Sequence, residues 1–132
     1  MSVRVELEGL AEQIAARSMA PYLLTSDDDG RPHATAIALR WDGDCLVGPC
    51  GRTSARNAGA RPAVSVLWPP NAPGEYSLIV DADMTVDEAN PTDGNSGGSR
   101  LACLTPTHAI LHRPAEVPDP TTDCAHDCQK LL

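Results

Sequence analysis

Residues 76–87, YSLIVDADMTVD, alternate between apolar and polar side chains over a length typical of a long β-strand. Apolar residues fill every second position from Tyr76 to Val86, and the positions between them carry Ser, Asp and Thr, with Ile79 as the exception. One face of such a strand packs on a core while the other meets solvent. The pattern predicts an antiparallel sheet with one buried face.

Five other segments are predicted to be strands because they are short, apolar and bounded by turn residues: 21–26, 33–41, 45–49, 63–68 and 100–114, the last bent or interrupted near Pro106. The sequence DDDGRP at 27–32 has the Asp-Gly chemistry of a hairpin turn. Short helices are predicted over 5–17, from the spacing of its apolar residues, and over 53–61, with Thr53 or Ser54 as N-cap and Pro62 as terminator. We therefore expect a mainly β fold: six antiparallel strands in a small barrel or twisted sheet, flanked by two short helices.

The length of 132 residues fits one domain, which we place at 1–118, followed by an irregular tail at 119–132. Residues 88–99 are expected to form a flexible loop. The net charge of −8 opposes binding to nucleic acid or to anionic membranes. No apolar run resembles a signal peptide or a membrane span, so we expect a cytoplasmic protein.

The five cysteines suit a reducing compartment better than a disulfide framework, since their number is odd and their spacing is not that of a small disulfide-rich scaffold. They are Cys45, Cys50, Cys103, Cys124 and Cys128.

The sequence GRTSARN at 51–57 concentrates positive charge in an otherwise acidic chain. No Asp or Glu occurs between Asp44 and Glu75, whereas three arginines do. Guanidinium groups, hydroxyls and the N–H groups of a helix start together make a set of donors for a phosphate monoester. A capped surface helix with solvated arginines is the alternative interpretation.

The strand that precedes this turn has one face of small side chains. Along 33–41 the alternation places Ala34, Ala36, Ala38 and Arg40 on one side, opposite the larger residues. Such a face leaves room for a flat ligand.

Residues 21–68, from YLLTSDDDGRP to AVSVLW, resemble the flavin-binding split β-barrel family typified by pyridoxamine 5′-phosphate oxidase, and in particular its small actinobacterial members. YSLIVDADMTV and HAILHRP add weaker support. The resemblance implies a split β-barrel, a homodimer with FMN at the subunit interface, and a small-molecule substrate. The cofactor would supply the redox chemistry, and no side chain is implied as an obligatory acid, base or nucleophile.

Position by position, the resemblance implies that Arg52, Thr53, Ser54 and Arg56 hold the phosphate and that Asn57 braces the helix. Arg40 would lie near the ring edge or the substrate, and the strand carrying Ala36 and Ala38 would lie along the ring. The chain lacks the oxidase's C-terminal substrate segment after HRPA, so oxidation of pyridoxamine phosphate is not implied. Deazaflavin coenzyme F-420 is an alternative cofactor, and a non-catalytic flavin-binding or stress-associated dimer is an alternative function.

Three other groups of residues could bind metal, and each has a simpler interpretation. His108 and His112 are four residues apart but lie in a predicted strand, without the glutamate of a zincin helix. Zinc could be chelated by Cys124, His126 and Cys128. The simpler interpretation is that these residues belong to an irregular tail and bind nothing. Residues 27–29 lack the later glutamate of a calcium loop and fit a solvated turn. We predict no metal site.

Overall fold

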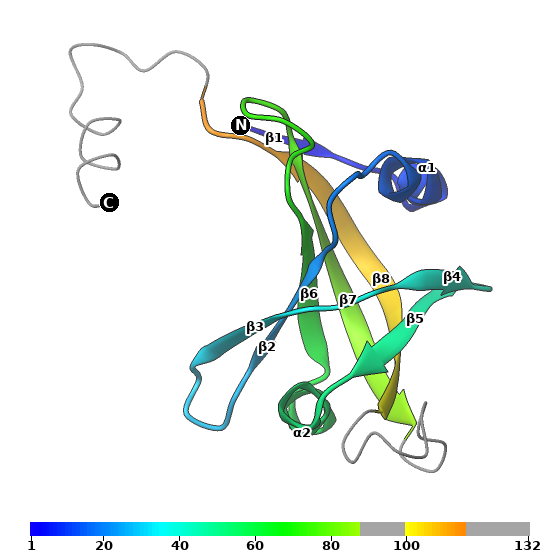
Figure 1. The fold of residues 1–132 in the computed structure, drawn as a ribbon, viewed down its shortest axis with the longest axis vertical. Coiled ribbons are helices and arrows are strands. Elements are labelled where there is room, and N and C mark those ends of the chain that lie inside the picture. The colour runs from blue at the N-terminus through cyan, green and yellow to red at the C-terminus, as the bar shows by residue number, and fades with distance from the viewer. Residues whose placement is uncertain (88–99, 116–132) are drawn as a thin grey trace.

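The computed structural model describes residues 1–87 and 100–115. Its elements are, in order, β1 (Ser2–Arg4), η1 (Leu7–Gly9), α1 (Leu10–Ala15), β2 (Tyr22–Ser26), β3 (Pro32–Ala36), β4 (Arg40–Asp42), β5 (Cys45–Cys50), α2 (Arg52–Ala60), β6 (Ala63–Trp68), β7 (Ser77–Asp87) and β8 (Arg100–His112). The strands pair antiparallel in the order β3-β2-β6-β7-β8-β5-β4, and β1 adds to β8. Figure 1 shows this sheet curling round on itself, with α1 and α2 at opposite ends. The mainly antiparallel β fold with two short helices is confirmed.

The described residues form eight strands, two more than the six predicted. One addition is β1, whose three exposed residues carry no alternation that the sequence could show. The other arises because the predicted strand 33–41 is divided into β3 and β4. At the division the N–H of Ile37 donates a hydrogen bond to the carbonyl of Pro21 at 3.1 Å. Beyond this point the chain leaves its partner β2 and pairs with β5 instead.

Gly48 permits this crossing. A methyl group at Gly48 would overlap the carbonyl oxygen of Ala38, so the segment between β3 and β4 lies directly against the β5 backbone. A residue without a Cβ is required for so close an approach. The contact brings the two ends of the sheet together.

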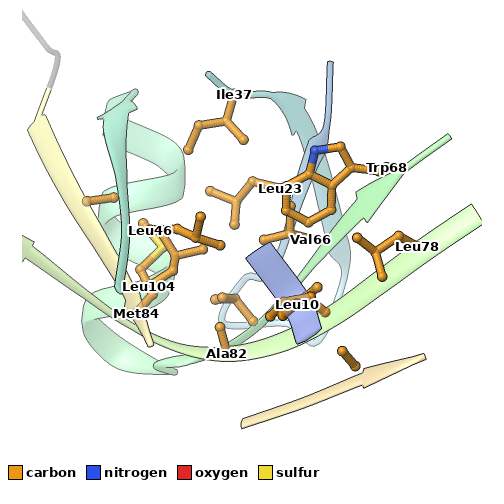
Figure 2. Close-up of a cluster of buried hydrophobic side chains, with 14 of the residues drawn as sticks. Leu10, Leu23, Ile37, Leu46, Val66, Trp68, Leu78, Ala82, Met84 and Leu104 are labelled. Carbon is orange, nitrogen blue, oxygen red and sulfur yellow. The ribbon is translucent and has the colours of Figure 1, made fainter. Parts of the chain in front are cut away.

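The core lies inside the curled sheet, as Figure 2 shows. Every second residue of β7 from Leu78 to Met84 is buried, as the alternation predicted. Leu10 of α1 is 1% exposed and enters the same cluster from one end of the barrel. The other members are mostly Val, Leu and Ala, with Trp68 as the one large aromatic in the cluster of fully buried residues.

The predicted bend near Pro106 is a β-bulge. Asp81 pairs with His108 and Ala82 pairs with Pro106, which leaves Thr107 as the extra residue of β8. Proline cannot donate to the ladder, and bulges are where a strand tolerates it. β8 therefore continues from Arg100 to His112 without ending at Pro106.

The N-terminal helical region is shorter than predicted. It consists of a 3-10 turn followed by the six residues of α1, where the sequence predicted a helix over 5–17. Two residues after α1, Arg17 donates from Nη1 to the carbonyl of Tyr76 at 2.7 Å, which ties the end of the helix to the chain before β7. Within 1–87 and 100–115, no helix is long and apolar enough to cross a membrane.

The structure corrects the interpretation of the cysteines. Cys45 of β5 and Cys103 of β8 form a disulfide with their Cα atoms 6.0 Å apart. The sequence separation of 58 residues gave no indication of this pair, because only the pairing of β5 with β8 brings them together. Cys50 is a buried free thiol. Cys124, His126 and Cys128 lie outside the described residues, as do the predicted loop 88–99 and tail 119–132.

Candidate functional site

Helix α2 separates its structural residues from its exposed basic residues. Ser54, Asn57 and Ala58 are buried against the sheet, whereas Arg52 and Arg56, one helical turn apart, are exposed. Residues three or four apart share a face of a helix, so the two groups point to opposite sides. One face docks the helix and the other is open to a ligand.

Two polar contacts fix the docked face. The side-chain amide of Asn57 donates to the hydroxyl of Thr25 in β2 at 3.0 Å, and both residues are buried. This confirms that Asn57 braces the helix. Just past the helix, Arg61 donates from Nε to the carbonyl of Ser26 at 2.9 Å and pairs with Asp28 at 2.9 Å. Arg61 therefore holds the β2–β3 hairpin and lies on a different side from the other arginines.

Helix α2 starts two or three residues earlier than predicted. The N-cap is Gly51, without a side-chain cap, where the sequence predicted Thr53 or Ser54. Thr53 is exposed in the first turn, but Ser54 is only 1% exposed. Of the four predicted phosphate ligands, Ser54 is thus the one whose side chain is turned into the protein. Pro62 follows the helix, as predicted.

Arg52 and Arg56 line a hollow of about 230 Å³ together with Ala55 and Arg100. Arg100 is the first residue of β8, and it reaches this place because it pairs with Cys50, two residues before the helix. Arg100 was not among the residues predicted for the site. The sequence places Arg100 at the start of the last predicted strand. It does not show that this strand pairs with β5, which is what brings Arg100 to the helix.

Cys50 is the last residue of β5 and pairs with Arg100, which lines the hollow. Burial raises the pKa of the Cys50 thiol, and the guanidinium of Arg100 opposes part of that rise. The thiol is therefore protonated at neutral pH and adds no negative charge near the arginines.

The face predicted to carry the alanines is exposed. Ala34, Ala36 and Ala38 are open to solvent, while the residues between them are at least half-buried. Among the strands that the structure describes, β3 pairs only with β2, so one edge of β3 has no partner among them. Ala36 and Ala38 do not line the arginine hollow, but the contact of Ala38 with Gly48 places their strand beside the part of β5 that leads into α2.

Arg40 is exposed on β4 and pairs with Val47, three residues before Cys50 along β5. It does not line the arginine hollow. The structure thus brings together Arg52 and Arg56, adds Arg100, and leaves Arg40 on the neighbouring strand. The alternation of exposed and less exposed residues continues across the β3–β4 break, so Arg40 is exposed like the alanines.

The two predicted strand histidines have separate surroundings. His108 lies 3.6 Å from the carboxylate of Asp81, and His112 hydrogen bonds the Ser2 hydroxyl at 3.1 Å. No group of three metal-ligating side chains occurs within the part of the chain that the structure describes. The Asp27 side chain accepts from the N–H groups of Asp29 and Arg31, as in a tight hairpin turn.

The fold is shared with proteins of known structure. Solved structures with this fold include a Listeria innocua protein named as a candidate pyridoxamine 5′-phosphate oxidase, with a TM-score of 0.62, 21% identity, and coverage of 80% of this chain and 98% of that one. A protein named F420 reductase has a TM-score of 0.57, 24% identity, and coverage of 74% and 94%. The fold is the split β-barrel of the pyridoxamine 5′-phosphate oxidase-like proteins, as the resemblance implied.

Two relatives match in sequence over nearly the whole chain. They are the uncharacterized proteins Mb0449c of Mycobacterium bovis and MT0457 of Mycobacterium tuberculosis, each 35% identical over 137 residues that cover 95% of this chain and 93% of the relative. The chain belongs to one split-barrel family with them. No protein-family model matches the sequence.

Proposed function

We propose that this protein binds FMN at the interface of a homodimer and acts as a small-molecule oxidoreductase. The observation that carries the proposal is the hollow lined by Arg52, Arg56 and Arg100 beside the first turn of α2. Guanidinium forks and helix N–H groups are the donors that a phosphate monoester takes. Thr53 adds an exposed hydroxyl in the same turn.

The alanine face would receive the ring system. Ala36 and Ala38 offer a flat exposed surface, and Arg40 at its end offers a cation to a ring edge or to a substrate. The bound flavin would supply the hydride chemistry, and the residues of this chain would orient it and set the charge around it.

A second copy of the chain is proposed to cover this face. The strand registers align an apolar row across the outer side of the sheet: Ala36, Tyr22, Leu67, Ile79 and Ile110. Tyr22 is 45% exposed, and the row runs directly from the alanine strand. A contiguous apolar row on the outer face of a sheet is typical of an association surface. Light scattering should give a dimer, and Tyr22→Glu should yield monomers that bind flavin more weakly.

The deazaflavin coenzyme F-420 is the alternative ligand. Arg100 brings a third guanidinium to the hollow, which would suit a more highly charged anion than one phosphate, and one protein of the same fold is named F420 reductase. A non-catalytic flavin-binding dimer would use the same residues. It would hold a flavin that no nicotinamide donor or reduced deazaflavin reduces.

The deciding experiment is a fluorescence titration of the purified protein with FMN and, separately, with the deazaflavin. We expect FMN to bind with micromolar or better affinity, and the native protein to carry a yellow chromophore. Tighter binding of the deazaflavin would select the alternative. If neither ligand binds, the proposed function is wrong.

A further inference from the structure

A second hollow, of about 470 Å³, lies at the α1 end of the barrel and shares no residue with the arginine hollow. Its walls are mainly apolar and come from three parts of the chain: Leu7 and Leu10 from the helical region, Trp41 from β4, and Pro106 from β8. A volume of this size is typical of a small-molecule site.

The hollow exists because the edge of β8 is uncovered there. β5 pairs with β8 up to Leu104, and β1 begins to pair at Ile110. Thr105 and Pro106 line the hollow between these two strands, where Pro106 has no N–H to offer to a neighbouring strand. The gap therefore follows from the strand pairing, because neither β5 nor β1 covers this part of β8.

Trp41 supplies an aromatic wall. The ring is half-buried and packs against the core, and its indole nitrogen is buried without a hydrogen-bond partner. Because that nitrogen is closed off from solvent, the carbon surface of the ring is what the hollow presents. The π face of tryptophan attracts cations more strongly than that of any other side chain.

Among the described residues that line the hollow, Asp44 is the only charged one. It sits in the two-residue turn between β4 and β5, where Asp42 pairs with Cys45 and Gly43 takes a φ of +66°. A two-residue turn with glycine first is a tight and well-defined hairpin connection, which fixes where the Asp44 backbone lies. The exposed carboxylate stands beside an otherwise apolar cavity.

We propose that this hollow binds a small organic cation, namely a primary amine carried on an aromatic or branched apolar body. The apolar walls would take the body, while the ring of Trp41 and the carboxylate of Asp44 would take the ammonium group. The carboxylate and the net charge of −8 both disfavour an anion. The proposal is independent of any flavin, because it uses none of the residues proposed to hold one.

The test uses the full chain labelled with ¹⁵N and three probes of the same shape: phenethylamine, 2-phenylethanol and 3-phenylpropionate. The protein has two tryptophans, so its spectrum contains two indole N–H signals, which Trp41→Phe and, independently, Trp68→Phe assign. We expect phenethylamine to shift the Trp41 signal saturably, with a dissociation constant in the millimolar range, and to leave the Trp68 signal in place. The alcohol should bind more weakly, and the carboxylate should not bind.

Asp44→Asn should weaken phenethylamine binding about fivefold, the upper end of what an exposed ion pair contributes. It should leave the alcohol unaffected. Asp42→Asn is the matched control, because it removes the same charge from an exposed residue of the same hairpin that does not line the hollow. Equal binding of the three probes, equal effects of the two substitutions, or no saturable shift of the Trp41 signal would each overturn the proposal.

Discussion

The side-chain amide of Asn57 in α2 donates a hydrogen bond to the hydroxyl of Thr25 in β2 at 3.0 Å. Both side chains are buried, and their contact joins the helix to the sheet. The contact spans 32 residues of sequence. It holds in place the helix whose other face carries Arg52 and Arg56.

We expect Asn57→Ala to lower the free energy of unfolding by about 1–3 kcal/mol, because it leaves the buried Thr25 hydroxyl without its donor. Urea denaturation of this variant, of Thr25→Val and of the double variant measures the coupling. The two single effects should sum to more than the effect of the double variant. Strict additivity would show that the hydrogen bond contributes nothing.

Arg56→Ala should weaken FMN binding by about 1.5–3 kcal/mol, the contribution of a charge-assisted hydrogen bond. Stability should be nearly unchanged because the side chain is exposed. Arg31→Ala removes an equally exposed arginine from the β2–β3 turn and should leave the dissociation constant unaltered. An Arg56→Ala variant that binds FMN like the wild type would place the phosphate elsewhere.

Gly48→Ala should destabilise the fold by about 1–3 kcal/mol, since the added methyl group would overlap the carbonyl oxygen of Ala38. Gly59→Ala is the contrasting control. A methyl group there meets nothing within 4 Å and lies in α2, so this variant should gain about 0.5–1 kcal/mol. Thermal denaturation of both proteins gives the comparison, and a stable Gly48→Ala protein would contradict the close packing of β5 on the crossing segment.

Cys45→Ser should lower the free energy of unfolding by about 2–4 kcal/mol, because the disulfide closes a loop of 58 residues in the unfolded chain. Cys103→Ser should behave alike. Dithiothreitol should destabilise the wild type by a similar amount and have little further effect on either variant. Alkylation of both thiols in unreduced, denatured protein, detected by mass spectrometry, would refute the pair.

The raised pKa of Cys50 predicts a loss of stability in alkali. Burial raises the pKa of the Cys50 thiol in the folded state above its ordinary value of 9.0. At a pH above 9.0 the unfolded chain therefore binds fewer protons than the folded one, so unfolding releases protons. The contribution of Cys50 to the free energy of unfolding is fully present below pH 9.0 and is lost as the pH rises through the pKa of the folded state. The difference in unfolding free energy between Cys50→Ala and the wild type, followed by urea denaturation from neutral to alkaline pH, should therefore shift in favour of the variant. A constant difference would show that Cys50 ionises equally in both states.

Much of the fold could be predicted because β2, β3, β6 and β7 alternate between more buried and more exposed residues. Leu78, Val80 and Met84 are buried where period two places them, and Ala34 and Ala36 are exposed by the same rule. β1 and the β3–β4 break could not be predicted, because both depend on pairing partners distant in sequence. The Cys45–Cys103 disulfide was missed for the same reason.

The candidate site was predicted in part. The charge of GRTSARN identified Arg52 and Arg56, and helical spacing separates them from the buried Asn57. Ser54 was assigned to the ligand although it faces the sheet, because the helix begins at Arg52 and so turns that residue inward. Arg100 required knowledge of the β5–β8 register.

The two-sided arrangement of α2 has a consequence for how proteins of this shape could diversify. Since anchoring depends on Ser54, Asn57 and Ala58, the exposed positions 53 and 56 can vary without dismantling the scaffold. A lineage could exchange one anionic ligand for another by a few substitutions on a single exposed helical face. Libraries randomised at positions 53 and 56 should keep their thermal stability while their ligand preference drifts.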